Sequence, residues 1–392
     1  MSRVVLAYSG GLDTSVAVTW LTEHGHEVIA VAVDVGQPGD LQEAVTRAPQ
    51  LGAVESRLVD AQERFVQGFV LPTIHMNGLY QGRYPLVSAL SRPLISQVLV
   101  EVAEEVKADA VAHGCTGKGN DQVRFEVSLG ALAPDLKVMA PVREWDMDRA
   151  ASLAFAEERK LPVRAQVDSL YSIDENLWGR AVECGPLEDP WTSAPEEVFT
   201  TAGGSAASPA EMEIAFNKGV PCAMDGEVLS PVALIHAVGK IAAGAGFGRV
   251  DMIEDRLVGI KTREVYEAPA ALTLIAAHQD LERLVLDKLY AREKRRLESV
   301  WADLVYEGLW FSPLRSAIES FAAAGQQVTS GDVRVRLTEG GCLPLARRSP
   351  HSLYDYSLAT YDAADAFDHS DAAGFVRLWG LPAKTWAGVN SR

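Results

Sequence analysis

The first fifteen residues place two adjacent glycines between an apolar run and a cluster of small polar residues. Residues 4–6 (Val-Val-Leu) favour a buried strand, and residues 9–15 (Ser-Gly-Gly-Leu-Asp-Thr-Ser) favour a tight turn that opens a helix. The first backbone N–H groups of a helix have no partner within it, and the helix dipole adds partial positive charge at the same end. This strand–turn–helix unit therefore predicts a phosphate-binding loop at the start of an α/β fold.

The same residues could serve only as a helix cap, because Asp, Thr and Ser are ordinary capping residues. Two better-known phosphate loops do not match. The dinucleotide-binding loop requires G-x-G-x-x-G, whereas Gly10 and Gly11 are adjacent. The Walker A loop requires Ser or Thr after Gly-Lys, whereas Gly119 follows Lys118. The pattern Ser-Gly-Gly-x-Asp-Thr-Ser instead resembles the pyrophosphate loop of ATP pyrophosphatases, which split ATP into AMP and pyrophosphate.

Composition and charge exclude several classes of protein. A chain of 392 residues is too long for one ordinary core, so at least two domains are expected. Lys and Arg number 36 against 53 Asp and Glu, and the net charge of −17 argues against a nucleic-acid partner. The sequence has neither a long apolar run nor room for a signal peptide before its first strand, so we expect a cytoplasmic protein with no membrane partner. The four cysteines are far apart, which fits free thiols better than zinc or disulfides.

The first 165 residues alternate apolar strands with amphipathic helices, which predicts a parallel, doubly wound sheet covered on both faces. In such sheets the ligand lies at the carboxyl ends of the strands. The clearest helix is predicted at residues 91–107, with Pro93 in its first turn. Strands are predicted at residues 3–8, 28–33, 54–59, 109–113 and 137–141. The other helices are predicted at residues 13–24, 40–52, 60–70, 121–131 and 146–160.

The pattern changes after about residue 166. Residues 186–211 are rich in Pro, Gly, Ser and Ala and predict a loop. Residues 269–300 predict one long helix that ends in a basic run at 292–296, interpreted as a solvated face rather than a nucleic-acid patch. Residues 332–337 alternate as in a half-buried strand. The last 35 residues carry aromatic side chains that must be buried somewhere, and a neighbouring subunit is plausible.

A second glycine-rich loop follows the predicted strand 109–113. Residues 113–126 read His-Gly-Cys-Thr-Gly-Lys-Gly-Asn-Asp-Gln-Val-Arg-Phe-Glu, and Lys118 would place a point charge beside a phosphate. Asn120 and Asp121 stand where the next helix begins, with Arg124 one turn further along. Helix capping and a surface ion pair could account for these residues singly. Both loops, however, fall on the same edge of the predicted sheet, which favours one shared site.

Taken together, residues 7–15 and 113–126 resemble argininosuccinate synthases. Further blocks match in order along nearly the whole chain, at residues 82–93, 171–180, 253–267 and 353–361. The resemblance implies an ATP-binding, pyrophosphatase-type domain at 1–165, an α+β synthetase and multimerisation domain at 166–364 and a helical oligomerisation tail at 365–392. It also implies an enzyme that joins L-citrulline to L-aspartate with ATP and Mg²⁺ in arginine biosynthesis, as a homotetramer. The Mg²⁺ ligands are not indicated.

The resemblance also assigns site residues. The first loop would take the pyrophosphate, and the backbone at Val33 would contact the adenine edge. Asp13, Lys118 and Asp121 are the implied catalytic residues. The implied ATP site consists of Ala7, Tyr8, Ser9, Gly10, Gly11, Leu12, Asp13, Thr14, Ser15, Val33 and Gly114. The implied aspartate site consists of Thr116, Asn120 and Asp121. The implied citrulline site consists of Tyr84, Asn120, Arg124, Ser172, Glu254 and Tyr266.

The substrates explain this choice of residue types. Citrulline is a zwitterion with a neutral ureido group, so it needs a cation, an acid and neutral hydrogen-bonding groups. Arg124, Glu254 and the Ser, Tyr and Asn residues of the implied site supply them. At Ala89 and Ala181 many relatives carry a serine that helps to hold citrulline. Ser88 is a candidate to replace the first of these, although neighbouring residues of an extended segment point to opposite faces.

Two alternatives share the first loop. RNA-thiolating or amidating relatives need an RNA surface, a persulfide pair of cysteines or a glutaminase partner, and the net charge of −17 and the isolated cysteines argue against the first two. A non-catalytic adenine-nucleotide sensor would keep residues 9–15 but would not need Arg124, Glu254 and Tyr266. The formation of AMP with and without citrulline distinguishes the three.

Overall fold

A computed structural model of the chain describes residues 2–117, 119–145, 149–162, 170–362 and 365–391. The chain divides into two compact units, residues 1–351 and 352–392. Among the described helices, none combines the length and apolarity that crossing a membrane would require.

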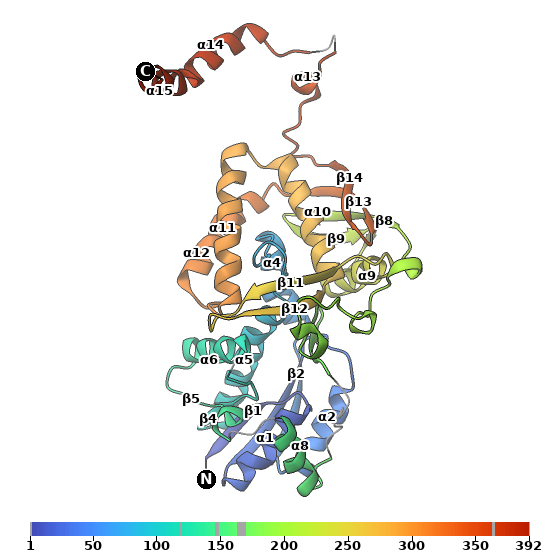
Figure 1. Cartoon of the computed structure of the whole chain (residues 1–392), viewed down its shortest axis with the longest axis vertical. Coiled ribbons are helices and arrows are strands. Elements are labelled where there is room, and N and C mark those ends of the chain that lie inside the picture. Colours follow the sequence, from blue (N-terminus) through green and yellow to red (C-terminus); the bar gives the residue numbers. More distant parts are fainter. Residues whose placement is uncertain (1, 118, 146–148, 163–169, 363–364, 392) are drawn as a thin grey trace. The chain divides into compact units, whose positions relative to one another are not determined.

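The first unit begins with the predicted parallel sheet (Figure 1). Its strands lie in the order β3-β2-β1-β4-β5, and every pair is parallel. The apolar run at residues 4–6 is fully buried in the central strand, as its sequence predicts. The chain order reverses at β1, so the loops that follow β1, β2 and β4 meet at one edge of the sheet, where ligands bind in folds of this kind. The strands are β1 (Arg3–Ala7), β2 (Glu27–Asp34), β3 (Glu55–Asp60), β4 (Ala110–Ala112) and β5 (Lys137–Met139).

Most helices of this part follow the predicted pattern. Helices α1 and α5 pack against the sheet, and α6 packs against α5 (Figure 1). Two predicted helices are interrupted, because Pro49 opens a 3₁₀ turn at Ala48–Leu51 and a π turn at Val66–Val70 separates α3 from α4. The helices are α1 (Leu12–Glu23), α2 (Leu41–Arg47), α3 (Gln62–Phe65), α4 (Leu71–His75), α5 (Val87–Val106), α6 (Asn120–Leu132), α7 (Pro141–Glu144) and α8 (Arg149–Glu158).

The prediction for the start of α5 is wrong. The helix begins at Val87, after Leu86 in the left-handed conformation (φ 64°), so Pro93 lies inside it and not in its first turn. The error in the predicted start of this helix has a physical reason. Residues 87–91 are all buried, so they show no amphipathic stripe from which a helix could be recognised.

The second half of this unit contains two antiparallel sheets, of order β10-β9-β8-β13-β14 and β11-β12-β7-β6, with helices packed beside them (Figure 1). The predicted strand at 332–337 is confirmed as β13, in which Val333, Val335 and Leu337 are fully buried. The predicted loop at 186–211 contains three short 3₁₀ turns and ends where β8 begins. The strands are β6 (Ser172–Asn176), β7 (Gly179–Glu183), β8 (Ala210–Asn217), β9 (Val220–Met224), β10 (Glu227–Val228), β11 (Arg249–Asp255), β12 (Lys261–Glu267), β13 (Gly331–Thr338) and β14 (Gly341–Arg348).

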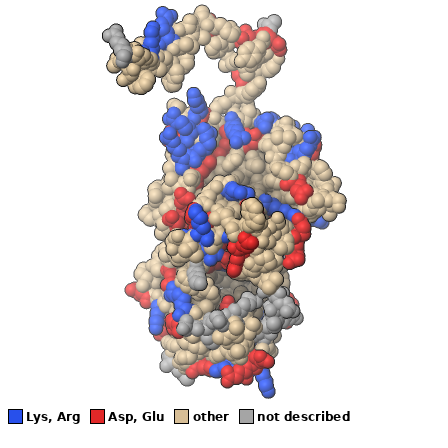
Figure 2. Space-filling view, viewed as in Figure 1, with Lys and Arg blue, Asp and Glu red and all other residues tan. Residues whose placement is uncertain are grey.

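The helices of this half correct a second prediction. Residues 269–300 form two helices, because the Asp287 side chain accepts hydrogen bonds from the backbone N–H groups of Leu289 and Tyr290 and caps a new helix. Lys and Arg side chains gather on the surface around α11 (Figure 2), as the solvated interpretation of the basic run expects. Lys294 is the exception: it is fully buried and pairs with Glu282 (3.0 Å) and Glu298 (2.7 Å). The helices are α9 (Pro231–Gly244), α10 (Pro269–Val285), α11 (Lys288–Tyr306) and α12 (Pro313–Gln326).

The second unit is helical. It contains α13 (Tyr356–Ala359), α14 (His369–Trp379) and α15 (Leu381–Asn390). In this chain alone its aromatic side chains are exposed, including Tyr361 (99%), Trp379 (76%) and Trp386 (70%). Its surface in Figure 2 is mainly uncharged.

Candidate active site

The loop after β1 adopts the geometry that its sequence predicts. Gly10 has φ +76°, and a Cβ atom there would lie 2.6 Å from the Cβ of Ala44, so both the conformation and the close packing require glycine. Helix α1 then begins at Leu12, and Gly11 at its N-cap gives no side-chain cap. Ser9 Oγ and Thr14 Oγ1 lie 3.1 Å apart across the loop. The N-terminus of α1 is therefore open to an anion from the direction of the two hydroxyls.

This loop forms one wall of a cavity of about 610 Å³. The cavity brings together residues that are up to 259 positions apart, from Ala7 in β1 to Tyr266 in β12. Gly10 and Ser15 do not line it, and Lys118 lies outside the described residues. The other predicted site residues all line it: Ala7, Tyr8, Ser9, Gly11, Leu12, Asp13, Thr14, Val33, Tyr84, Gly114, Thr116, Asn120, Asp121, Arg124, Ser172, Glu254 and Tyr266.

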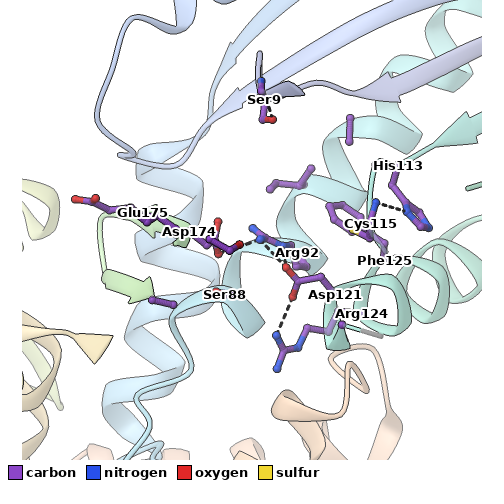
Figure 3. A pocket seen from close by; sticks show the side chains of 18 of the residues that line it. Ser9, Ser88, Arg92, His113, Cys115, Asp121, Arg124, Phe125, Asp174 and Glu175 are labelled. Carbon is purple, nitrogen blue, oxygen red and sulfur yellow. Dashed lines mark hydrogen bonds and ion pairs between the residues drawn. The ribbon is translucent and has the colours of Figure 1, made fainter. Parts of the chain in front are cut away.

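Opposite the loop, a chain of charged groups crosses the cavity wall (Figure 3). Arg92 of α5 contacts both Asp121 (2.6 Å) and Asp174 (2.9 Å), and Asp121 also contacts Arg124 (2.8 Å). Burial alone would raise the pKa of Asp121, but the charges and hydrogen bonds of Arg92 and Arg124 outweigh it and lower the pKa to about 2. Asp121 is therefore a carboxylate throughout the physiological range and a poor acceptor of protons.

Arg124 is held on three sides. Its Nη1 contacts Asp121, its Nε donates to the carbonyl oxygen of Tyr306 (3.0 Å), and its guanidinium lies over the Tyr306 ring at 4.9 Å. Its Nη2 is buried and has no hydrogen-bond partner among the described residues. A buried guanidinium N–H without a partner is costly, so this atom is available to an anion that enters the cavity.

Glu254 is a buried carboxyl at the end of β11. The hydroxyls of Tyr266 and Tyr306 both donate to it, at 2.6 Å each. Burial raises the pKa of Glu254 to about 7, and the negative charge of Glu264 adds to the rise, although both hydroxyls and Arg124 oppose it. A carboxyl of this kind gains from a cationic partner, because the cation stabilises the charged form that burial disfavours.

Tyrosine rings surround this carboxyl. Tyr84 stacks on Tyr266 at 4.2 Å between ring centroids, and its edge meets Tyr306 at 6.1 Å. The Tyr306 hydroxyl also accepts a hydrogen bond from Asn120 Nδ2 (2.8 Å). Tyr306 thus contacts Asn120, Arg124 and Glu254 together, although it does not itself line the cavity.

The two alanine positions differ in the structure. Ala181 lines the cavity, whereas Ala89 is buried and does not. Ser88 does line the cavity. The argument that adjacent residues must point to opposite faces is wrong here, because residues 88 and 89 lie in helix α5 and not in an extended segment. A serine hydroxyl is therefore available on this wall.

Sequence reasoning gave no role to several cavity residues. Arg92 and Asp174 stand inside the blocks 82–93 and 171–180, so a search for charges within those blocks would have found them. Tyr306 lies in none of the matching blocks, and no local pattern marks it. Gln37 was also missed: its side chain lines the cavity beside Val33.

Comparisons with known proteins agree along the whole chain. A family model described as the N-terminal HUP domain of arginosuccinate synthase matches residues 3–162, and one described as the C-terminal domain matches residues 171–386. An argininosuccinate synthase of Bacillus pumilus is 53% identical over 393 residues, covering 100% of this chain and 98% of that protein. One of Lactiplantibacillus plantarum is 51% identical, covering 100% of this chain and 96% of that protein. One of Oceanobacillus iheyensis is 52% identical, covering 99% and 94%.

Proposed function

The chain belongs to the argininosuccinate synthase family, and we propose that the family reaction takes place in the cavity between the phosphate loop and Tyr266. The enzyme is a ligase that joins L-citrulline to L-aspartate in arginine biosynthesis, with ATP as substrate. One observation carries the placement: an open helix N-terminus, a guanidinium with an unpartnered nitrogen and a buried carboxyl share one cavity. Together they match the charges of ATP and a zwitterionic amino acid.

We place the triphosphate of ATP at the loop of residues 9–15, where backbone N–H groups and the hydroxyls of Ser9 and Thr14 can donate to it. The adenine would then lie against the end of β2, at the backbone of Val33. Gly114 lies beside Thr14, since a Cβ atom there would be 2.9 Å from Thr14 Cγ2, so glycine keeps the two loops close. Lys118, in the second loop, would add a positive charge.

The residues present fit a Mg²⁺ ion carried by the nucleotide. The described residues contain no cluster of three or more His, Cys, Asp or Glu side chains that could hold a metal ion. Asp13 lies in the first turn of α1 and lines the cavity, and Mg²⁺ is commonly held by one carboxylate together with substrate phosphates. When bound, Mg²⁺ would offset the negative charge of the departing pyrophosphate.

We place citrulline between Arg124 and Glu254. The unpartnered Nη2 of Arg124 suits its carboxylate, and Glu254 suits its ammonium group. Tyr84, Ser88 and Ser172 line the same cavity and offer hydroxyl groups to the neutral ureido group. Asn120 stands between the two amino-acid sites, held by Leu257 and Tyr306.

Aspartate is placed at Thr116, Asn120 and Asp121. Its carboxylates would meet the neutral donors of Thr116 and Asn120, and Asp121 would pair with its ammonium group. Since the pKa of Asp121 is lowered to about 2, this residue acts by its charge and not by taking a proton. Its catalytic role is therefore electrostatic.

The chemistry follows from these positions. The ureido oxygen of citrulline attacks the α-phosphorus of ATP, the bond to the bridging oxygen breaks, and pyrophosphate leaves. The ammonium group of aspartate first loses a proton to water. The resulting amine attacks the ureido carbon of this citrullyl-adenylate, AMP leaves with the ureido oxygen, and a second proton leaves the nitrogen as the guanidinium of argininosuccinate forms. Holding the reactants in line and balancing their charges carries most of such a reaction.

Oxygen labelling tests this order. Citrulline labelled with heavy oxygen in its ureido group should give AMP that carries the label. Mass spectrometry of AMP and pyrophosphate after one turnover measures the transfer of the label. The control uses ATP and unlabelled citrulline in water labelled with heavy oxygen. Label in pyrophosphate, or AMP labelled from water alone, would show that citrulline is not the group that becomes adenylated.

The alternatives with the same loop are disfavoured by the site. Burial raises the pKa of the Cys115 thiol, with the charge of Asp121 adding to the rise, so this cysteine is protonated and unsuited to persulfide chemistry. A nucleotide sensor would not require Arg124 and Glu254 on one cavity wall. AMP formation that needs neither citrulline nor aspartate would nevertheless favour a different reaction.

The raised pKa of Glu254 predicts a pH dependence. Above about pH 7 the carboxyl is ionised and can pair with the citrulline ammonium group, and below it the neutral acid cannot. We therefore expect kcat/KM for citrulline to fall about tenfold per unit below an apparent pKa near 7, since kcat/KM reports the free enzyme. Initial rates between pH 5.5 and 8.5 measure it. Glu254→Gln should remove the inflection, and a profile unchanged by that substitution would rule out Glu254 as its source.

We further propose a cytoplasmic homotetramer. The four cysteines are free thiols, which suits a reducing compartment. The exposed aromatic side chains of α14 and α15 form more apolar surface than a free tail normally carries. Light scattering should give four chains for the intact protein and a smaller assembly for a chain cut after Asp365. An intact monomer, or the same assembly after truncation, would contradict this role of the tail.

A further inference from the structure

The end of β2 presents two backbone groups that are both bound by one side chain. Gln37 Nε2 donates to the carbonyl oxygen of Val33 (2.8 Å), and Gln37 Oε1 accepts from the N–H of Val35 (2.7 Å). All three residues line the cavity. The carboxamide thus closes a ring with the backbone at the position where we place adenine.

These backbone groups lie beyond the part of β2 that pairs with β1. Pairing of β1 with β2 ends at Ala7 and Val31, and the N–H of Tyr8 makes the last contact, to the Val31 carbonyl (2.9 Å). Alternate residues of a strand direct their backbone groups to the same side, so Val33 and Val35 continue that row. There β1 has already turned into the phosphate loop, which leaves the row open toward the cavity.

Adenine carries the same pair of groups as the glutamine amide. Its exocyclic N6 donates and its ring N1 accepts, side by side, as do Nε2 and Oε1 of glutamine. A carbonyl followed two residues later by an N–H group would therefore bind either one. Guanine presents the reverse pair, an acceptor at O6 and a donor at N1, and fits neither backbone group.

We propose that Gln37 is an internal mimic of the adenine edge, which occupies the Val33 carbonyl and the Val35 N–H until ATP displaces it. The inference rests on the proposed position of ATP. Binding then exchanges one pair of hydrogen bonds for another, so the adenine edge contributes selectivity between bases but little net affinity. Water is also kept from these two groups while the site is empty.

The surrounding turn supports a movement confined to the side chain. Gly36 has φ +88°, and a Cβ atom there would lie 2.8 Å from Leu177 Cβ, so this turn is packed tightly. Its N–H donates to Asp34 Oδ1 (2.8 Å), and the Val35 carbonyl accepts from the N–H of Leu177 (2.9 Å). The backbone of residues 34–36 is thus fixed with or without the Gln37 amide, and rotation of that side chain alone frees the two groups.

Removal of the mimic should therefore strengthen nucleotide binding. We expect Gln37→Ala and Gln37→Met each to lower the Kd of ATP and of AMP about fivefold or more, since two hydrogen bonds no longer have to be broken. Titration calorimetry on the full-length protein, without citrulline or aspartate, measures both values. Pyrophosphate, which has no base, should bind as it does to the unaltered protein. Gln42→Ala, a glutamine exposed on α2, is the matched control and should change nothing.

A variant of the phosphate loop separates this inference from the proposed function. Thr14→Val should weaken ATP and pyrophosphate if the triphosphate binds there. If Thr14→Val weakens ATP while both Gln37 variants leave its Kd unchanged or raise it, the ATP site stands and the mimic is overturned. If Thr14→Val also leaves ATP binding unchanged, the proposed position of ATP is overturned, and the inference that rests on it falls with it. Equal tightening of pyrophosphate by the Gln37 variants would likewise overturn the mimic, because the effect would not come from the base.

Discussion

Arg92→Leu should lower the free energy of unfolding by about 2–4 kcal/mol at pH 7, because it leaves two carboxylates without their shared cation. Arg92 bridges Asp121 and Asp174 at 2.6 and 2.9 Å, and its side chain is 15% exposed. Removal of one member of a buried ion pair costs more than the pair contributes, since the remaining charge stays poorly hydrated. The expected loss is lower than for a sealed pair, because Arg92 lines the cavity and water can reach the carboxylates.

Denaturant unfolding of the intact protein measures this loss. Arg295→Leu, at an exposed position of α11, is the control and should change the stability by no more than about 0.5 kcal/mol. Adding Asp174→Asn to Arg92→Leu should recover part of the loss, because it removes one of the two repelling charges. An Arg92→Leu protein as stable as the parent, or a double variant less stable than Arg92→Leu alone, would contradict the bridging role.

The pH dependence of this effect has a definite sign. The pKa of Asp121 is lowered to about 2, mainly by Arg92 and Arg124 against the opposing effect of burial, and its ordinary value is 3.8. The stabilisation of the carboxylate is thus fully present above pH 3.8 and is lost as the pH falls toward 2. The difference in stability between the parent and Arg92→Leu should shrink in that window.

The sequence predicted the elements whose signals are local. The phosphate loop depends on Gly10 and on the residues that open the next helix, all within one turn of chain. The parallel sheet follows from apolar strands that alternate with amphipathic helices, and the structure confirms that its strands are parallel. Even the strand at 332–337 was recognisable, because its alternation reflects one buried face.

The errors arose where tertiary packing replaces a local signal. Residues 87–91 at the start of α5 are all buried, so periodicity cannot reveal them, and the sequence pattern wrongly places Pro93 in the first turn. The break between α10 and α11 depends on one N-cap residue, Asp287, which lies between two long stretches of helical apolar periodicity. Tyr306 joins Asn120, Arg124 and Glu254 only because α11 ends beside α6 and β11 in space. No spacing within the sequence carries that information.

Arg124→Lys should lower kcat/KM for citrulline by an amount that corresponds to about 2–4 kcal/mol of lost transition-state stabilisation, although it keeps the positive charge. Arg124 contacts Asp121 through Nη1 and the Tyr306 carbonyl through Nε, and this leaves Nη2 for a substrate carboxylate. A lysine has one ammonium group on a flexible chain and cannot meet three acceptors in fixed directions. It would also lose the planar contact with the Tyr306 ring at 4.9 Å.

Steady-state rates with citrulline varied measure this loss, and titration calorimetry without citrulline or aspartate measures the binding of ATP separately. The Kd of ATP should change less than about twofold, because we place its phosphates at the opposite wall of the cavity. Arg64→Lys is the matched control: Arg64, like Arg124, makes hydrogen bonds through two of its nitrogens, here to Glu101 at 2.6 and 2.9 Å, but it lies on the surface away from the cavity. It should leave the kinetics unchanged. Equal losses for ATP and citrulline in Arg124→Lys would mean that Arg124 holds the cavity wall together through Asp121 and Tyr306, and that another group binds the citrulline carboxylate.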